Sequence, residues 1–226
     1  MKMSITKLTV TVVASMAAAG LAHATLLNPG TWSGSDAIPE GNPVGIATSV
    51  TVSDPGDLAI NDVSVQLNIS GGYDGNLYGY LVYQPSSEAT TAGNTPSMIV
   101  LLNQIGTSGI NPFGEAGAGF NVTLSDSGTL ANDNGGDIHS ASGSPVTGIY
   151  TPDSSQTFDE TFTGSADGTW TLFLADLSAG GGVSTLNSWQ VDISVVPEPI
   201  TWALVGFAGA LGLARFIAWR RQSKTA

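Results

Sequence analysis

Alternating apolar and polar residues predict several short β-strands along the chain. In 62–69 the apolar side chains occupy every second position, and polar side chains lie between them. The same period recurs in 170–174 and in 189–195. Because successive side chains of a strand point to opposite faces, this period predicts strands with one buried face and one solvated face. Residues 77–83 and 98–102 are more densely apolar, which predicts strands that are more deeply buried.

The residues between these stretches favour turns and loops. The chain from 25 to 195 is rich in Gly, Ser, Thr, Asn and Asp and contains few good helix formers. Short strands separated by turn residues are typical of two antiparallel sheets packed face to face. The sequence therefore predicts an all-β domain, an antiparallel β-sandwich. The chain has no cysteine, so no disulfide stabilises this domain and it relies on packing alone.

Three tryptophans lie in the predicted domain. Trp170 and Trp189 fall on the apolar faces of predicted strands, so we interpret them as core residues; a platform for stacking sugars is the alternative. Trp32 lies near the start of the domain, where we expect a more exposed side chain.

The first 24 residues predict a secretory signal peptide. Lys2 and Lys7 lie at the charged start, and 8–22 is a run of apolar or small residues. Ala22 and Ala24 then place small side chains at the two positions that signal peptidase reads. A first transmembrane anchor is the alternative, but the run is rich in alanine and shorter than the roughly 20 strongly apolar residues that a span needs. We expect cleavage after Ala24.

Residues 200–219 predict a transmembrane helix. The stretch is almost wholly apolar, and a helix that rises about 1.5 Å per residue would span roughly 30 Å over this length. Arg215 lies one turn from its end, where a long side chain can reach the membrane interface. Arg220, Arg221 and Lys224 follow, so the positive-inside rule places this end of the chain in the cytoplasm and the predicted sandwich outside it. A core helix would need a polar face, and this stretch has none.

The charged residues are divided between the ends and the middle of the chain. All six basic residues lie in the two targeting ends, and all 18 acidic residues lie between Asp36 and Glu198. The exported body therefore has no Lys or Arg with which to bind a phosphate backbone, which excludes nucleic acid as a partner. It also predicts that no salt bridge forms in this domain. The acidity either keeps an exported protein soluble or supplies oxygen ligands for a hard cation such as Ca²⁺.

Three loops contain candidate calcium ligands. Asp74 and Asn76 lie in a glycine-flanked loop between predicted strands, and Asp176 closes another strand. Asp133 and Asp137 flank a third stretch that is rich in Asn and Gly. Side-chain oxygens in such loops suit Ca²⁺, but the same residues also form Asx-turns without any metal. Both interpretations remain open, and Asp176 is the first candidate for a calcium ligand.

The exported body offers few groups for catalysis. His139 is its single histidine, because His23 leaves with the signal peptide, and no Gly-x-Ser-x-Gly elbow accompanies it. Its neighbours are polar and small, so we expect a solvated surface side chain. Zinc would need more His or Cys ligands than the body has. The acidic residues single out no carboxylate pair of the glycosidase type. We therefore predict that the protein is not an enzyme; an uncharacterised hydrolase is the remaining alternative.

The end of the chain combines three features in a fixed order. Pro197, Glu198 and Pro199 precede the apolar stretch, and the arginine cluster closes it. This order resembles the PEP-CTERM sorting signal of Gram-negative bacteria, and the resemblance covers 196–226. It implies recognition by an exosortase, removal of the membrane anchor, and release to the cell surface or to an extracellular polysaccharide matrix. The anchor in the inner membrane is then transient.

The most specific segment of the body is GTWTLFLAD over 168–176, which Leu186 and Trp189 follow. With its neighbours from about 38 to 195, it is similar to the P domain (P/Homo B) that follows the catalytic domain in subtilisin-like proprotein convertases. The resemblance implies a jelly-roll β-sandwich, and bacterial members are often calcium-loaded accessory modules. The chain has Asn76 where that family usually has the aspartate of a Gly-Asp-Leu motif.

These features predict three parts: a signal peptide over 1–24, a P-domain-like β-sandwich over 25–195 and a sorting signal over 196–226. The expected partners are signal peptidase, an exosortase and the membrane. We expect a non-enzymatic exported protein of the cell surface or extracellular matrix, structural or adhesive in role. The alternative is a calcium-dependent glycan-binding module that acts on the surrounding extracellular polysaccharide.

Overall fold

The computed structural model describes residues 24–56, 58–86, 96–127, 136–196 and 209. The described strands belong to one compact unit from His23 to Pro197. The predicted signal peptide, the Pro-Glu-Pro motif and the apolar stretch over 200–219, except Gly209, lie outside the described residues. Among the described residues, no helix has the length and apolar character needed to cross a membrane.

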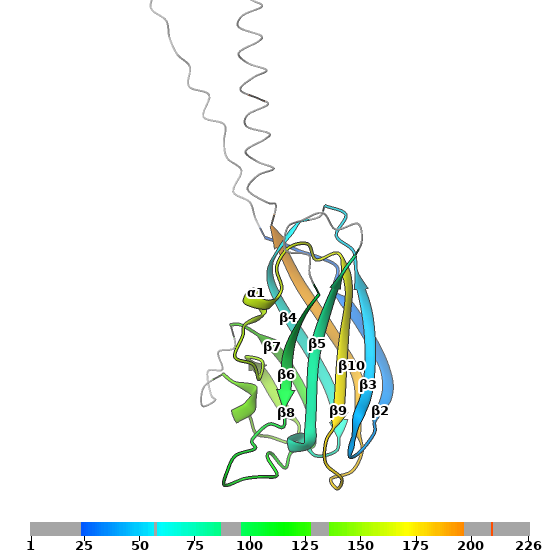
Figure 1. Ribbon diagram of the computed structural model, residues 1–226, viewed down its shortest axis with the longest axis vertical. Helices are drawn as coiled ribbons and strands as arrows, with labels where there is room; N and C mark the ends of the chain where they lie inside the picture. The colour runs from blue at the N-terminus through cyan, green and yellow to red at the C-terminus, as the bar shows by residue number, and fades with distance from the viewer. Residues whose placement is uncertain (1–23, 57, 87–95, 128–135, 197–208, 210–226) are drawn as a thin grey trace, which may run out of the picture. The chain divides into compact units, whose positions relative to one another are not determined.

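Two sheets packed face to face make up the domain (Figure 1). The prediction of an all-β sandwich is therefore confirmed. The first sheet has six strands, with β1, β10, β4, β7 and β8 in that order and β2 also paired with β10. Its strands are β1 (Thr25–Leu26), β2 (Gly30–Ile38), β4 (Ala59–Gly71), β7 (Gly119–Ser125), β8 (Val146–Tyr150) and β10 (Ser184–Val196). All of its pairs are antiparallel except β7 with β8.

The second sheet has four antiparallel strands in the order β3, β9, β5, β6. Its strands are β3 (Asn42–Val52), β5 (Leu77–Pro85), β6 (Ser97–Asn103) and β9 (Gly168–Asp176). In Figure 1 this sheet lies in front of the six-stranded one. Three short helical segments occupy the connections: η1 (Asp74–Asn76), η2 (Ile138–Ser140) and α1 (Phe158–Thr161).

The core lies between the two sheets and consists of the side chains that the alternating patterns predict. In each of the three alternating stretches, 62–69, 170–174 and 189–195, the apolar positions are buried and the positions between them are not. The buried apolar residues of these stretches are Val63, Val65, Leu67, Ile69, Trp170, Leu172, Leu174, Trp189, Val191, Ile193 and Val195. Burial of this face is the main stabilising contribution available to a domain without cysteine.

The two densely apolar stretches differ from the prediction. Leu77, Leu81 and Tyr83 are buried in the core, as expected. Tyr78 and Tyr80, however, lie on the outer face of the four-stranded sheet and are only partly buried. The strands are apolar on both faces but covered on one. The composition of a strand thus indicates how apolar its two faces are, whereas the layers of the fold decide which face is covered.

Candidate cation site and histidine cluster

Asp176 lies at the end of β9, where that strand meets both of its neighbours. It is opposite Leu77 of β5 and Asn42 of β3. The side chain is fully buried, and its Oδ1 accepts hydrogen bonds from the backbone N–H groups of Ser178 at 3.1 Å and Gly41 at 3.5 Å. Its Oδ2 is buried and has no hydrogen-bond partner among the described residues. A further hydrogen-bond donor or a cation beside Oδ2 would reduce the free-energy cost of burying this carboxylate.

Asn76 lies at the same corner of the domain, at the end of η1. Its backbone carbonyl accepts a hydrogen bond from Leu177 N at 2.9 Å. Its Nδ2 donates to two backbone carbonyl oxygens, Ser178 O at 3.2 Å and Gly180 O at 3.0 Å. Two converging carbonyl oxygens are a typical part of a calcium site. Here the N–H₂ group of Asn76 donates to both carbonyl oxygens, so the neutral side chain takes the place that a bound cation would occupy between them.

Asp74 is buried like Asp176, but its hydrogen bonds go to another loop. Its backbone N–H donates to Gly117 O at 3.0 Å, and its Oδ1 accepts from Gly119 N at 2.6 Å. Burial is the largest cause that raises the pKa of Asp74, to about 7; the Gly119 N–H lowers it and the charge of Glu115 raises it. Its Oδ2 is buried without a partner among the described residues. Asp74 thus ties η1 to the loop that precedes β7.

The remaining two candidates lie apart from these. Asp133 falls outside the described residues. Asp137 is the N-cap of η2, and its Oδ1 accepts a hydrogen bond from His139 N at 2.9 Å. In the described part of the chain, no three His, Cys, Asp or Glu side chains are grouped so that they could hold a metal ion. Asp176 and Asn76 are therefore the two predicted ligands whose hydrogen bonds meet, at Ser178.

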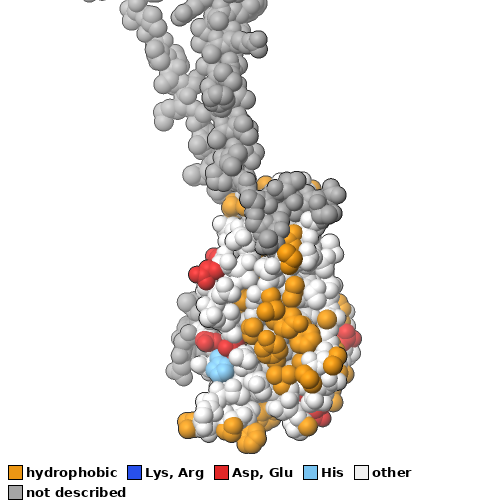
Figure 2. All heavy atoms as spheres, in the orientation of Figure 1, with side chains coloured by type: hydrophobic (Ala, Val, Ile, Leu, Met, Phe, Trp, Pro, Cys, Tyr) orange, Lys and Arg blue, Asp and Glu red, His pale blue; other side chains and the backbone are white. Residues whose placement is uncertain are grey.

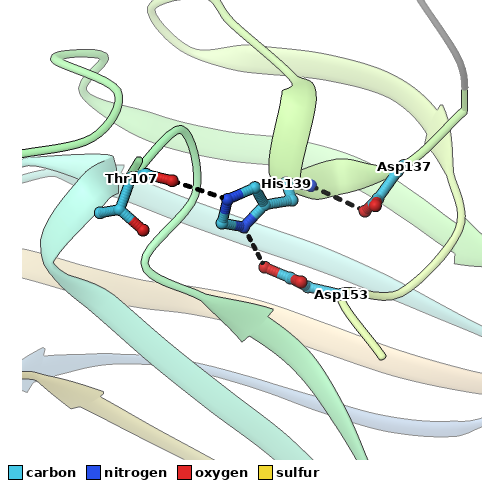
Figure 3. Close-up of polar contacts among 4 residues, drawn as sticks. All are labelled: Thr107, Asp137, His139 and Asp153. Atoms are coloured by element: carbon cyan, nitrogen blue, oxygen red, sulfur yellow. Dashed lines mark hydrogen bonds and ion pairs between the residues drawn. The ribbon is translucent and has the colours of Figure 1, made fainter. Parts of the chain in front are cut away.

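His139 is held on both sides of its ring, as Figure 3 shows. Its Nδ1 lies 2.7 Å from Asp153 Oδ2, and its Nε2 lies 3.0 Å from the backbone oxygen of Thr107. The backbone of His139 also links η2 to the loop after β6, because His139 O accepts a hydrogen bond from Gly106 N at 2.7 Å. The expectation of a solvated surface histidine holds in part: the side chain is 32% exposed, but both ring nitrogens have protein partners. The expectation that the domain has no salt bridge is wrong, because protonated His139 forms one with Asp153.

Both ring nitrogens of His139 therefore face acceptors. A carboxylate and a backbone carbonyl cannot donate, so only the doubly protonated ring satisfies both contacts. The hydrogen bond to Asp153 is the largest cause that raises the pKa of His139 above its ordinary value of 6.5. Burial raises the pKa of Asp153, although the hydrogen bond from His139 and its charge lower it. Asp137 adds a second negative charge beside the ring and also favours the protonated form.

His139→Gln is expected to remove a pH-dependent part of the stability. Because the pKa of His139 is raised by folding, its contribution is fully present below pH 6.5 and is lost as the pH rises through the folded-state pKa. The side chain is 32% exposed, so we expect a cost of only about 1 kcal/mol at pH 6. Urea unfolding of the wild type and the variant at pH 6 and pH 9 measures this. An equal difference at both pH values would contradict the assigned protonation.

The tryptophans occupy different environments. Trp170 and Trp189 are buried, as predicted. Trp189 also donates from Nε1 to Thr48 Oγ1 at 2.8 Å. Trp32 lies in β2 opposite Trp189 and packs against the core while only partly buried. The ring is therefore less available for stacking a sugar than its position near the start of the domain suggested.

Comparison with known proteins gives no family assignment. No family model matches the chain, and no curated protein matches it. Among solved structures, the Aeromonas sobria serine protease in complex with its chaperone has a TM-score of 0.42 and 15% identity, covering 78% of this chain and 28% of the other. The structure of the Aeromonas sobria serine protease has a TM-score of 0.41 and 14% identity, covering 77% of this chain and 28% of the other. The chain thus spans less than a third of the length of these proteins, and the similarity is too low to carry an argument.

Proposed function

We propose that the chain is a non-enzymatic exported protein of the cell surface or extracellular matrix, structural or adhesive in role. Signal peptidase removes 1–24, and an exosortase of a Gram-negative bacterium processes the protein at Pro197, Glu198 and Pro199. The anchor over 200–219 holds the chain in the inner membrane until then, with Arg220, Arg221 and Lys224 on the cytoplasmic side. The finer fold that we propose is a jelly-roll sandwich of the P-domain type.

The observation that carries this proposal is the division of the chain into an acidic body and basic ends. All 18 acidic residues lie between Asp36 and Glu198, and all six basic residues lie outside that range. Positive charges at the ends suit the cytoplasmic sides of an export signal and an anchor. In the described part of the chain the last strand is β10, which ends at Val196, immediately before Pro197. A processing motif directly after the last strand can be cut without disturbing the sheet.

Glu198→Gln tests the sorting proposal in the native host. We expect the variant to accumulate as the longer, membrane-anchored form, because the changed residue lies at the centre of the proposed motif. Immunoblots of membrane, surface and medium fractions measure this, and the same result is expected in a strain without the exosortase. Asp192→Asn is a matched control, since it removes one carboxylate from the nearby strand and leaves the motif intact. Unchanged processing of the Glu198 variant would contradict the proposal.

A calcium-dependent glycan-binding module is the second candidate function, and a hollow at the Asn76 corner favours it. The hollow has a volume of about 470 Å³, and Tyr73, Asn76, Phe113 and 178–180 line it. Phe113 is 73% exposed, so its ring can contact a sugar. The buried carboxylate of Asp176 lies two residues before the lining segment 178–180 and would be the first calcium ligand. Binding of a neutral polysaccharide that is lost on chelation of calcium and in Phe113→Ala would favour this candidate.

A further inference from the structure

The outer face of the four-stranded sheet carries an apolar patch. Tyr80 of β5 stands opposite Phe173 of β9 on one side and Val100 of β6 on the other. Tyr78, Val82 and Met98 on the same face are also apolar, with Met98 50% exposed, whereas Thr171 beyond Phe173 is polar. We define the apolar patch by six residues: Tyr78, Tyr80, Val82, Met98, Val100 and Phe173. Figure 2 looks onto this face and shows apolar side chains gathered over its middle, with acidic side chains at the margins.

No charged side chain interrupts this face. Strands β3, β5, β6 and β9 together contain one acidic residue, Asp176, which is fully buried, and no basic residue or histidine. The outer face of the six-stranded sheet differs, because Asp62 and Asp192 lie on it among Gln, Asn and Ser side chains. The body over 25–196 contains 17 of the 18 acidic residues, since Glu198 lies beyond it, yet the strands of this sheet carry no surface charge. An extended apolar face of this kind is typical of an interaction surface.

The aromatic rings of the patch are arranged for burial against another apolar surface. Tyr80 and Phe173 stack on each other, with ring centroids 4.6 Å apart and an interplanar angle of 18°. Tyr78 contacts Tyr80 edge to face, at 6.0 Å and 63°. Stacking covers one face of Tyr80 and one face of Phe173, which leaves less open ring surface for a sugar than two separate rings would.

We propose that the apolar patch is a self-association surface, on which a second copy of this chain docks with the same patch. The exported body has no Lys or Arg, so any contact that uses its acidic surfaces brings like charges together. Docking patch to patch avoids this repulsion. Two sheet faces can pack through interdigitating side chains about 10 Å apart, as the two sheets of a sandwich do. A two-fold axis makes such a contact isologous and closed.

The test uses the body over 25–196, which belongs to a compact unit with its own core. Sedimentation equilibrium should show a monomer–dimer equilibrium. Tyr80→Asp should weaken the dimer by about 100-fold or more, because it buries two unpaired charges in the interface. Thr147→Asp is the matched control: it places the same charge at an exposed strand position of the six-stranded sheet and should leave the dimer unchanged. If circular dichroism shows that Tyr80→Asp is misfolded, Met98→Asp replaces it.

Salt provides a second readout. The dimer brings two anionic bodies together through an uncharged contact, so raising NaCl from 20 to 500 mM, about a fivefold fall in Debye length, should strengthen it. A body that stays monomeric, a dimer that Tyr80→Asp leaves intact, or a dimer that salt weakens would each overturn the inference. A monomer that binds neutral polysaccharide through Tyr80 would overturn it in favour of a sugar ligand.

This inference rests on the proposed structural role, for which self-association would supply the mechanism. The two can nevertheless fail separately. The purified body needs no exosortase, so a monomeric body would leave the sorting proposal standing. Unprocessed wild-type chain in cells, together with a dimeric purified body, would overturn the sorting proposal and support the self-association surface.

Discussion

Replacing Trp170 by alanine is expected to lower the free energy of unfolding by about 3–5 kcal/mol. Trp170 is fully buried and stacks on Tyr83, with ring centroids 4.4 Å apart and an interplanar angle of 25°. Phe162 meets it edge to face at 4.9 Å. Its Nε1 donates to Ala166 O at 3.4 Å. The variant would lose these ring contacts and leave a cavity that its two aromatic neighbours, Tyr83 and Phe162, cannot both fill from their different segments.

Thermal and urea unfolding of the body over 25–196 measure this cost. At about 2–4 °C per kcal/mol for a domain of this size, the melting temperature should fall by roughly 6–20 °C. Thr171→Ala is the control on the same strand, since Thr171 lies on the outer face and, among the described residues, its hydroxyl bonds only Ser49 Oγ, at 2.8 Å. It should cost about 1 kcal/mol or less. Equal losses in the two variants would contradict the assignment of Trp170 to the central aromatic cluster.

The sequence predicted the core well because the relevant signal is local. Each alternating stretch, such as 62–69, indicates by itself which side chains share a face. Two such faces must be buried against each other, which defines the sandwich. The outward position of Tyr78 and Tyr80 could not be predicted in the same way. An apolar side chain on the outer face violates no local rule, and its exposure depends on which strands end up beside it and which layers cover it.

The histidine cluster depended on contacts that are distant in sequence. His139 meets Asp153 and the carbonyl of Thr107, which are 14 and 32 residues away. No spacing rule connects these residues, because the loops that carry them come together only once the chain has folded. One signal was present. A single histidine in a body without Lys or Arg is the one side chain there that can become a cation near neutral pH, so an acidic partner was to be expected.

The cation site stays a prediction. The sequence singled out Asp176 and Asn76 in separate places, and it did not predict that their hydrogen bonds meet at one corner. Asp74 lies close to Asn76 in sequence, yet its carboxylate is bound by the loop before β7. The direction of a side chain in a short turn depends on backbone angles, and composition does not determine them. The neutral side chain of Asn76 was the informative signal, because it places an amide rather than a charge where two carbonyls converge.

Asn76→Asp is expected to destabilise the body by about 3–5 kcal/mol in the absence of calcium, because it leaves an uncompensated buried charge. Asn76 is 6% exposed, and its Nδ2 donates to Ser178 O and Gly180 O. A carboxylate at this position would lose both hydrogen bonds and place an oxygen against two carbonyl oxygens. Asp176, fully buried next to Leu177, would add a second negative charge at the same corner.

Calcium should then rescue the variant, since the carboxylate and the two carbonyls together offer the oxygen ligands that the ion prefers. At 100 times its dissociation constant, a bound ion restores about 2.7 kcal/mol, or roughly 5–11 °C in melting temperature. Asn76→Ala is the matched control, because it loses the same two hydrogen bonds without adding a charge and should not respond to calcium.

Thermal melts of the wild type, Asn76→Asp and Asn76→Ala in EDTA and in millimolar CaCl₂ measure this rescue. A rescue of Asn76→Ala equal to that of Asn76→Asp would contradict the explanation. A calcium response in the wild type would instead place the ion at Asp176 without help from residue 76, and would favour the calcium-dependent function over the structural one.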